Sequence, residues 1–93
     1  MGELPSAVAR LTVLNTQGLH ARAAATLVKA LSGLSAEVRV SWEGQTVNGR
    51  SMLDLMTLGA PRGSVLEIRT TGTDAEAALA ALTKVIENRF YEE

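Results

Sequence analysis

Cysteine is absent from the 93-residue sequence, and histidine occurs only once. Disulfide bonds and thiolate metal sites are therefore excluded, and a lone histidine is a weak basis for any other metal centre. Aromatic residues are scarce as well, with one Trp, one Tyr and one Phe, so few rings could stack on nucleic-acid bases. The formal net charge is only −1, which gives no field that would attract nucleic acid or anionic lipid. We expect no metal, no cofactor and no nucleic-acid partner.

Long hydrophobic runs are also missing. No window approaches the roughly 18 apolar residues that a membrane span needs, and residues 1–9 lack the basic stretch and apolar run of a secretory signal. We therefore expect a cytoplasmic protein without membrane insertion. Hydrophobic residues nevertheless make up 46% of the chain, enough for a modest core of aliphatic side chains. The length predicts a single domain over residues 1–93, which we expect to be a monomer.

Alternating apolar and polar residues predict the strands. In the first, Ala9, Leu11 and Val13 alternate with polar or exposed neighbours. Glu43 and Gly44 supply the turn of a hairpin between two further strands. The predicted strands cover residues 7–14, 36–42, 45–48 and 64–71.

Helical spacing of apolar residues predicts three helices. The first begins near His20 or Ala21 and ends about Ser32 or Gly33. The second covers residues 52–58, with Ser51 as N-cap and Asp54 three residues later. The third follows Gly72, with Thr73 and Glu76 in capping-box spacing. Its buried face is predicted to contain Ala75, Ala78, Leu79, Leu82, Val85, Ile86 and Phe90.

The order strand, helix, strand, strand, helix, strand, helix is that of a split β-α-β fold. We predict an α+β open-faced sandwich, in which three helices cover one face of a four-stranded antiparallel sheet.

One segment joins an uncommon ionisable residue to a helix start, namely Gly18-Leu19-His20-Ala21-Arg22. The first amides of a helix lack intrahelical partners, and the helix dipole places positive charge there. Such a terminus binds phosphate, and the guanidinium of Arg22 adds donors that match phosphoryl oxygens. The positive surroundings favour a neutral imidazole whose nitrogen lone pair could attack phosphorus. The alternative is that His20 only caps the helix and Arg22 is solvated surface.

The segment from Gly18 to Ala24 closely resembles the phosphohistidine signature of HPr proteins, carriers of the bacterial phosphoenolpyruvate-dependent phosphotransferase system. Residues 48–59, Asn-Gly-Arg-Ser-Met-Leu-Asp-Leu-Met-Thr-Leu-Gly, look like the family's second signature, around its regulatory serine. The resemblance extends over about residues 7–90. Its order of elements agrees with the order that periodicity predicts.

The resemblance implies a phosphocarrier that takes a phosphoryl group on Nδ1 of His20 from enzyme I and passes it to enzyme IIA-type domains. Arg22 and the backbone amides of Ala21 and Arg22 would stabilise the phosphate. Such a protein is a recycled protein substrate and not a turnover enzyme. Ser51 matches the serine that a dedicated kinase, the HPr kinase/phosphorylase, modifies in many members. An ordinary N-cap explains a serine there equally well.

The partner-docking surface implied by the resemblance includes Leu19, Met52, Leu53 and Met56. Core packing is the competing explanation for the residues on the short helix, where periodicity favours Leu55 and Leu58 as the core positions. The terminal residues 89–93 show no further chemistry.

Two residues depart from the family pattern. Ala23 stands where many sugar-system members have proline, which leaves the site intact because alanine suits a helix. Asp54 places an acid on the expected docking face, where glycine or a basic residue is common. Alanine after the arginine resembles carriers of nitrogen-linked regulatory branches, so the sugar-uptake branch and the regulatory branch both stay open. A protein-binding module switched at Ser51 and a small RNA- or ligand-binding domain are the other candidate functions.

Overall fold

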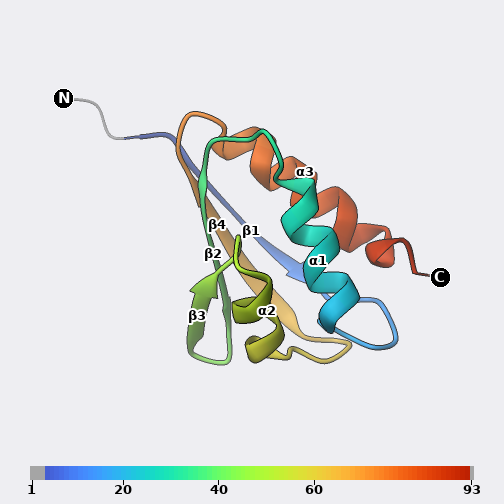
Figure 1. Ribbon diagram of the computed structural model, residues 1–93. Helices are drawn as coiled ribbons and strands as arrows, with labels where there is room; N and C mark the ends of the chain where they lie inside the picture. The colour runs from blue at the N-terminus through green and yellow to red at the C-terminus, as the bar shows by residue number, and fades with distance from the viewer. Residues whose placement is uncertain (1–3, 93) are drawn as a thin grey trace.

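The computed structural model describes residues 4–92, and Figure 1 shows their arrangement. Seven helices and strands follow one another in the predicted order, and a short 3-10 turn, Arg89–Tyr91, comes after the last helix. The elements are β1 (Ser6–Thr12), α1 (Ala21–Ala30), β2 (Glu37–Trp42), β3 (Gln45–Asn48), α2 (Met52–Leu58), β4 (Val65–Thr71) and α3 (Ala75–Glu87).

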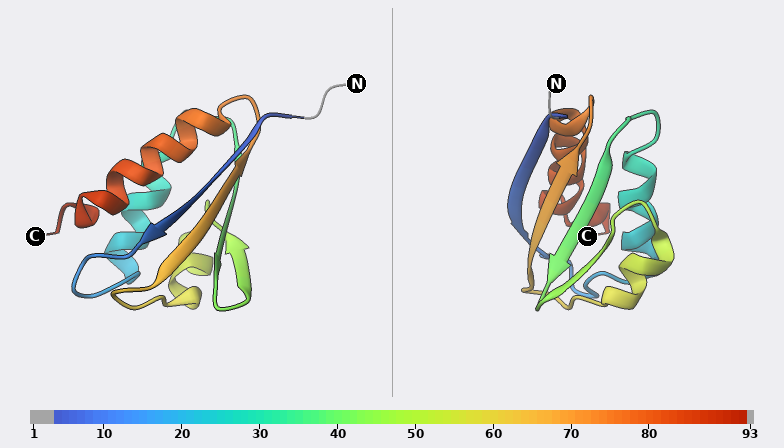
Figure 2. Two further views of the ribbon diagram at one scale, coloured as in Figure 1. Left: turned by 180° about the vertical axis from the view of Figure 1, so that it is seen from behind. Right: turned by 90° about the vertical axis from the view of Figure 1, so that its left-hand side faces the viewer.

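The four strands form one antiparallel sheet in the order β1-β4-β2-β3. The register places Ser6 opposite Thr71 between β1 and β4, and Trp42 opposite Gln45 in the β2–β3 hairpin. In the right-hand view of Figure 2 the strands lie in front, and α1 and α3 lie behind them. The predicted open-faced α+β sandwich is therefore confirmed.

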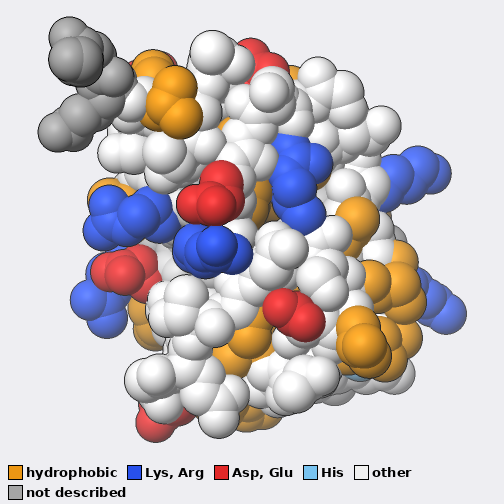
Figure 3. All heavy atoms as spheres, turned by 60° about the vertical axis from the view of Figure 1, so that its left-hand side comes forward, with side chains coloured by type: hydrophobic (Ala, Val, Ile, Leu, Met, Phe, Trp, Pro, Cys, Tyr) orange, Lys and Arg blue, Asp and Glu red, His pale blue; other side chains and the backbone are white. Residues whose placement is uncertain are grey.

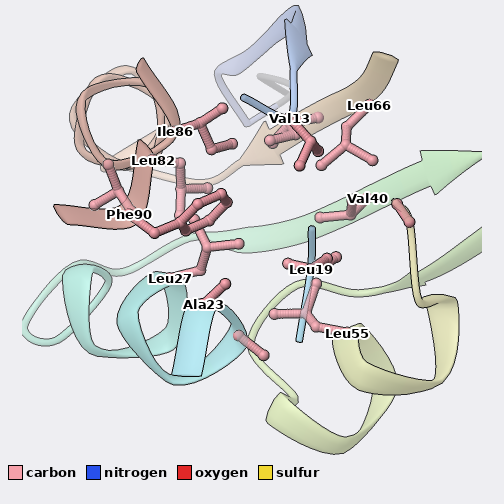
Figure 4. Close-up of a cluster of buried hydrophobic side chains, with 14 of the residues drawn as sticks. Val13, Leu19, Ala23, Leu27, Val40, Leu55, Leu66, Leu82, Ile86 and Phe90 are labelled. Carbon is pink, nitrogen blue, oxygen red and sulfur yellow. The ribbon is translucent and has the colours of Figure 1, made fainter. Parts of the chain in front are cut away.

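The core lies between the helices and the covered face of the sheet. Alternate strand residues point into it, and Val38, Leu66 and Ile68 have no exposed surface, as the two-residue period of a strand requires. The helices contribute one face each, and α1 and α3 meet over the sheet. Figure 4 shows Val13, Leu19, Ala23, Leu27, Val40, Leu55, Leu66, Leu82, Ile86 and Phe90 in this core.

The uncovered face of the sheet carries charges of both signs (Figure 3). Arg10 on β1 lies opposite Glu67 on β4, and Arg39 on β2 pairs with Glu37 at 3.3 Å. Exposed pairs of this kind contribute little to stability, but they keep the open face polar. None of the described helices is long and apolar enough to cross a membrane.

Several predicted boundaries move by one or two residues. β1 ends at Thr12, two residues early, and Val13 instead exchanges backbone hydrogen bonds with Gly63 and Ser64. α1 ends at Ala30, and the turn that follows reaches Gly33, which has the left-handed φ of +81° expected of a helix-closing glycine.

The predicted capping box at the start of α3 is wrong. The N-cap is Asp74 and not Thr73, and its side chain makes no capping hydrogen bond. The Asp74 carboxylate instead accepts a hydrogen bond from the backbone N–H of Ser35 at 2.7 Å, so it ties the start of α3 to the loop before β2. Phe90 is buried as predicted, but it lies in the turn beyond α3 and not on the helix.

Gly18 allows two loops to approach each other just before α1. Its φ is +70°, and a Cβ atom there would lie 2.7 Å from the carbonyl oxygen of Ala60 and 2.9 Å from Cα of Pro61. The next residue, Leu19, donates its N–H to that same carbonyl at 2.8 Å. Glycine is therefore required both by the left-handed conformation and by the close backbone contact.

Replacing Gly18 with alanine is expected to lower the free energy of unfolding by about 2–4 kcal/mol, because backbone strain and a backbone clash add together. Gly44 is the matched control, since its φ is +79° and nothing lies within 4 Å of the added Cβ. Gly44→Ala should cost only the strain, about 1–2 kcal/mol. Urea unfolding measures both, and equal losses would show that the contact with Ala60 is unimportant.

Candidate functional site

His20 is the N-cap residue of α1. Its backbone is extended, with φ −93° and ψ −174°, and its Nδ1 accepts a hydrogen bond from the backbone N–H of Arg22 at 3.3 Å. The ring is thus turned toward the amides of the first helical turn, and 26% of the side chain is exposed. Gly18, two residues before His20, permits the turn that leads into α1. Leu19 anchors this turn in the core, since it is only 3% exposed.

The other ring nitrogen of His20 contacts a carboxylate from the end of the chain. Nε2 lies 2.8 Å from Oε2 of Glu92. A carboxylate can only accept, and the amide of Arg22 can only donate, so both contacts are satisfied by the neutral tautomer with its proton on Nε2. In that tautomer Nδ1 keeps its lone pair, at the mouth of the helix.

The side chain of Asn15 holds the Glu92 carboxylate by a hydrogen bond. Its side-chain amide donates to Oε1 of Glu92 at 3.0 Å and to the carbonyl of Gly18 at 2.8 Å. Asn15 has no exposed surface, and only 9% of the Glu92 side chain is exposed. A buried amide therefore links the turn before His20 to the acid that holds its ring.

Arg22 lies on the exposed side of the site. Together with Thr16, Gln17 and Glu92 it lines a small open cavity of about 270 Å³. Arg22 belongs to the first turn of α1, the helix that His20 caps, and its guanidinium has donors suited to phosphoryl oxygens. Within residues 4–92, no cluster of three or more His, Cys, Asp or Glu side chains could hold a metal ion.

Ser51 caps α2 as predicted, since its hydroxyl accepts a hydrogen bond from the N–H of Asp54 at 3.1 Å. The Asp54 carboxylate turns back and accepts from the N–H of Asn48 at 3.3 Å. Arg50, just before the cap, donates to the carbonyls of Leu34 and Ala36. Hydrogen bonds therefore hold the start of α2, at Ser51, to the end of β3 and to the loop before β2. The regulatory modification of Ser51 stays a prediction.

The three predicted docking residues on α2 are exposed. Met52 and Met56 are each 40% exposed and Leu53 is 71% exposed, whereas Leu55 and Leu58 are in the core as predicted. Figure 3 shows the hydrophobic side chains gathered on this side of the molecule. We call Met52, Leu53 and Met56 the α2 patch.

The expectation that Leu19 belongs to the docking surface is wrong. Its side chain is buried and points toward Leu55 in Figure 4. Leu19 acts by anchoring the histidine loop to the core, because an apolar side chain next to the helix start is more stable buried than exposed.

Glu92 and Asn15 belong to the site but are not among the residues predicted from the sequence. The terminal residues were expected to show no chemistry, which is wrong for Glu92; Glu93 lies outside the described residues. Glu92 is 72 positions away from His20 in the chain, and no local pattern marks such a pairing. Figures 1 and 2 show how the end of α3 brings the C-terminal segment to the loop that precedes α1.

The fold and this geometry define a small α+β protein that presents one histidine at the mouth of a helix. Residues 8–88 match the family model described as the PTS HPr component phosphorylation site. The phosphocarrier protein HPr of Xylella fastidiosa (strain Temecula1) is 42% identical over 83 residues, covering 89% of this chain and 93% of the relative. HPr from Neisseria meningitidis serogroup A is 39% identical over 82 residues, covering 88% and 92%.

Solved structures of HPr proteins are also similar to this chain. HPr-C-His from Thermoanaerobacter tengcongensis superimposes with a TM-score of 0.88 at 36% identity, covering 94% of this chain and 98% of that one. A structure described as an HPr dimer from the same organism has a TM-score of 0.72 at 34% identity, covering 97% and 98%. The chain belongs to the HPr family of phosphocarrier proteins of the phosphotransferase system.

Ser51→Ala is expected to lower the free energy of unfolding by about 1 kcal/mol, because the N–H of Asp54 loses its acceptor. Ser32→Ala is the control, since Ser32 is an exposed serine in the turn after α1 and should change stability by less than about 0.5 kcal/mol. Denaturant unfolding compares the two variants. If Ser51→Ala is as stable as the parent, the cap contributes nothing.

Proposed function

We propose that this chain accepts a phosphoryl group on Nδ1 of His20 from phosphorylated enzyme I and passes it to enzyme IIA-type domains. The observation that carries the proposal is the contact of Nδ1 with the N–H of Arg22 at 3.3 Å. A nitrogen held there has a lone pair and lies beside donors suited to a phosphoryl group. The chain is then a protein substrate that is recycled, acting as a monomer, and not a turnover catalyst.

The transfer step follows from the tautomer. The Nδ1 lone pair forms a bond to phosphorus while the bond from phosphorus to the donor breaks, and that electron pair leaves with the donor. The N–H of Arg22 loses Nδ1 as its acceptor and becomes available to a phosphoryl oxygen, together with the N–H of Ala21. The guanidinium of Arg22 adds charge-assisted hydrogen bonds from the solvent side.

The α2 patch is the proposed docking surface for both partners. Exposed methionine and leucine side chains form adaptable apolar contacts. α2 packs against α1, so a partner seated on the patch would face the site of His20. The carboxylate of Asp54 accepts a hydrogen bond from the N–H of Asn48 at 3.3 Å, and the effect of this acid on partner choice stays open. Ala23 is fully buried, and its place in the core fits either branch of the system.

Ser51 supports a second, compatible function as a regulatory switch written by HPr kinase/phosphorylase. The hydroxyl stands at the N-terminus of α2, directly before Met52 of the α2 patch. A phosphate there would be stabilised by the helix start, and its charge would face a partner seated on the patch. If the chain acts in a nitrogen-linked regulatory branch, it would bind its regulator through this same α2 patch.

His20→Ala is expected to abolish acid-labile labelling by enzyme I and radiolabelled phosphoenolpyruvate, because the accepting atom is removed. Arg22→Ala should still be labelled, but roughly tenfold more slowly, since one charge-assisted interaction is lost. Gel autoradiography measures both, and circular dichroism confirms that each variant folds. Undiminished acid-labile phosphate on the His20→Ala protein would refute the assignment.

Leu53→Asp is expected to slow transfer from enzyme I by about 5–30-fold, because a buried interface contact is replaced by a charge. Leu4→Asp is the matched control, since Leu4 is another exposed leucine, at 62%, and it precedes β1 and does not belong to α2. Both variants should unfold at nearly the parent's denaturant midpoint. Equal transfer rates for the two variants would place docking on another surface.

A further inference from the structure

We propose that Glu92 is a positioning residue for His20, whose carboxylate keeps the proton on Nε2 while Nδ1 takes up and releases the phosphoryl group. This inference rests on the proposed phosphocarrier function and adds a role to the end of the chain. Its basis is the contact of 2.8 Å between Nε2 and Oε2. The carboxylate is itself held by the buried amide of Asn15 at 3.0 Å.

The C-terminal turn that leads to Glu92 has an unusual backbone conformation. Arg89, Phe90 and Tyr91 have φ values of 55°, 56° and 59°, a run of three non-glycine residues in the left-handed region. Each such residue is disfavoured, and strain of this kind persists only where other contacts fix it. The Phe90 side chain supplies one such contact, because it is 2% exposed and points toward Leu27 and Leu82 (Figure 4).

The charge that the His20 ring carries during phosphoryl transfer explains what the Glu92 carboxylate would do. When neutral imidazole attacks through Nδ1, the ring becomes a cation that carries its proton on Nε2, and no proton has to leave. A carboxylate in contact with that proton stabilises the cation, as the acid of a catalytic triad stabilises its imidazolium. In the onward transfer the N–P bond breaks, its electron pair returns to Nδ1, and the ring is again neutral with the same proton.

Protonation of Nε2 also determines how readily the phosphoryl group leaves. A protonated phosphoimidazole departs as neutral imidazole, whereas an unprotonated one would have to depart as an imidazolate anion. Two charged residues contact the ring among the hydrogen bonds of the described chain, Glu92 through its carboxylate at Nε2 and Arg22 through its backbone N–H at Nδ1. They act on opposite partners, since Arg22 suits the phosphoryl oxygens and Glu92 suits the ring cation.

The test compares Glu92→Gln with Glu87→Gln. Glutamine keeps the shape of Glu92 and removes its charge, and Glu87 is an exposed acid at the end of α3, so the control makes the same charge change away from the ring. Each protein is labelled with ¹⁵N at the histidine and phosphorylated with enzyme I and phosphoenolpyruvate. Nitrogen NMR at about pH 8 then reports the fraction of phosphorylated rings with a proton on Nε2, and the rate of phosphate loss is followed in parallel.

The parent and Glu87→Gln are expected to retain the proton on most phosphorylated rings. Glu92→Gln should lose it and hold its phosphate roughly tenfold longer, the effect of one charge-assisted hydrogen bond. Glu92→Asp, which keeps the charge on a shorter side chain, should fall between the two. The amide resonance of Phe90 shows whether the C-terminal turn is retained in each variant.

The experiment distinguishes a failure of the Glu92 inference from a failure of the proposed phosphocarrier function. If Glu92→Gln retains the turn and matches the parent in both protonation and phosphate loss, Glu92 has only a packing role and the inference is overturned. If the parent itself acquires no phosphate on His20, the proposed phosphocarrier function fails instead.

Discussion

Two loops meet beside the start of α1, and the site depends on how closely they meet. Leu19 donates its N–H to the carbonyl of Ala60 at 2.8 Å, and Gly18 makes room for that contact because it has no Cβ atom. The side chain of Leu19 then enters the core next to α2. These contacts fix the residue at which α1 begins, and therefore fix the ring of His20 against the first helical amides.

Local patterns predicted most of the fold, because each depends on neighbouring residues only. Strand alternation, the Glu43-Gly44 turn and the Ser51 cap are all satisfied within a few positions of the chain. Helical periodicity likewise separated Leu55 and Leu58 from the exposed residues of the α2 patch. His20 and Arg22 could be found for the same reason, since a histidine, an arginine and a helix start lie within one short motif.

The features that the sequence did not predict are contacts between distant segments. Thr73 has the right spacing for a capping box, but the position of the cap depends on Asp74 binding Ser35, 39 positions earlier. Leu19 lies within a recognised motif, yet its burial depends on α2. Glu92 reaches His20 only because α3 has the length to cross the sheet and Phe90 has a place in the core beyond it. Tertiary contacts determine all three, and none leaves a periodic signal.

The two nitrogen atoms of the His20 ring have different surroundings, and this difference suits a protein that must both accept and release a phosphoryl group. On the Nε2 side the ring meets a mostly buried carboxylate backed by a buried amide, so its orientation is fixed before any partner arrives. On the Nδ1 side the hydrogen bond is longer, at 3.3 Å, and Arg22 is exposed. Full enclosure of the phosphoryl group would stabilise it against onward transfer. Under the proposal that partners dock on the α2 patch, a site left open on that side would let the docked partner supply the remaining contacts to the transferring group.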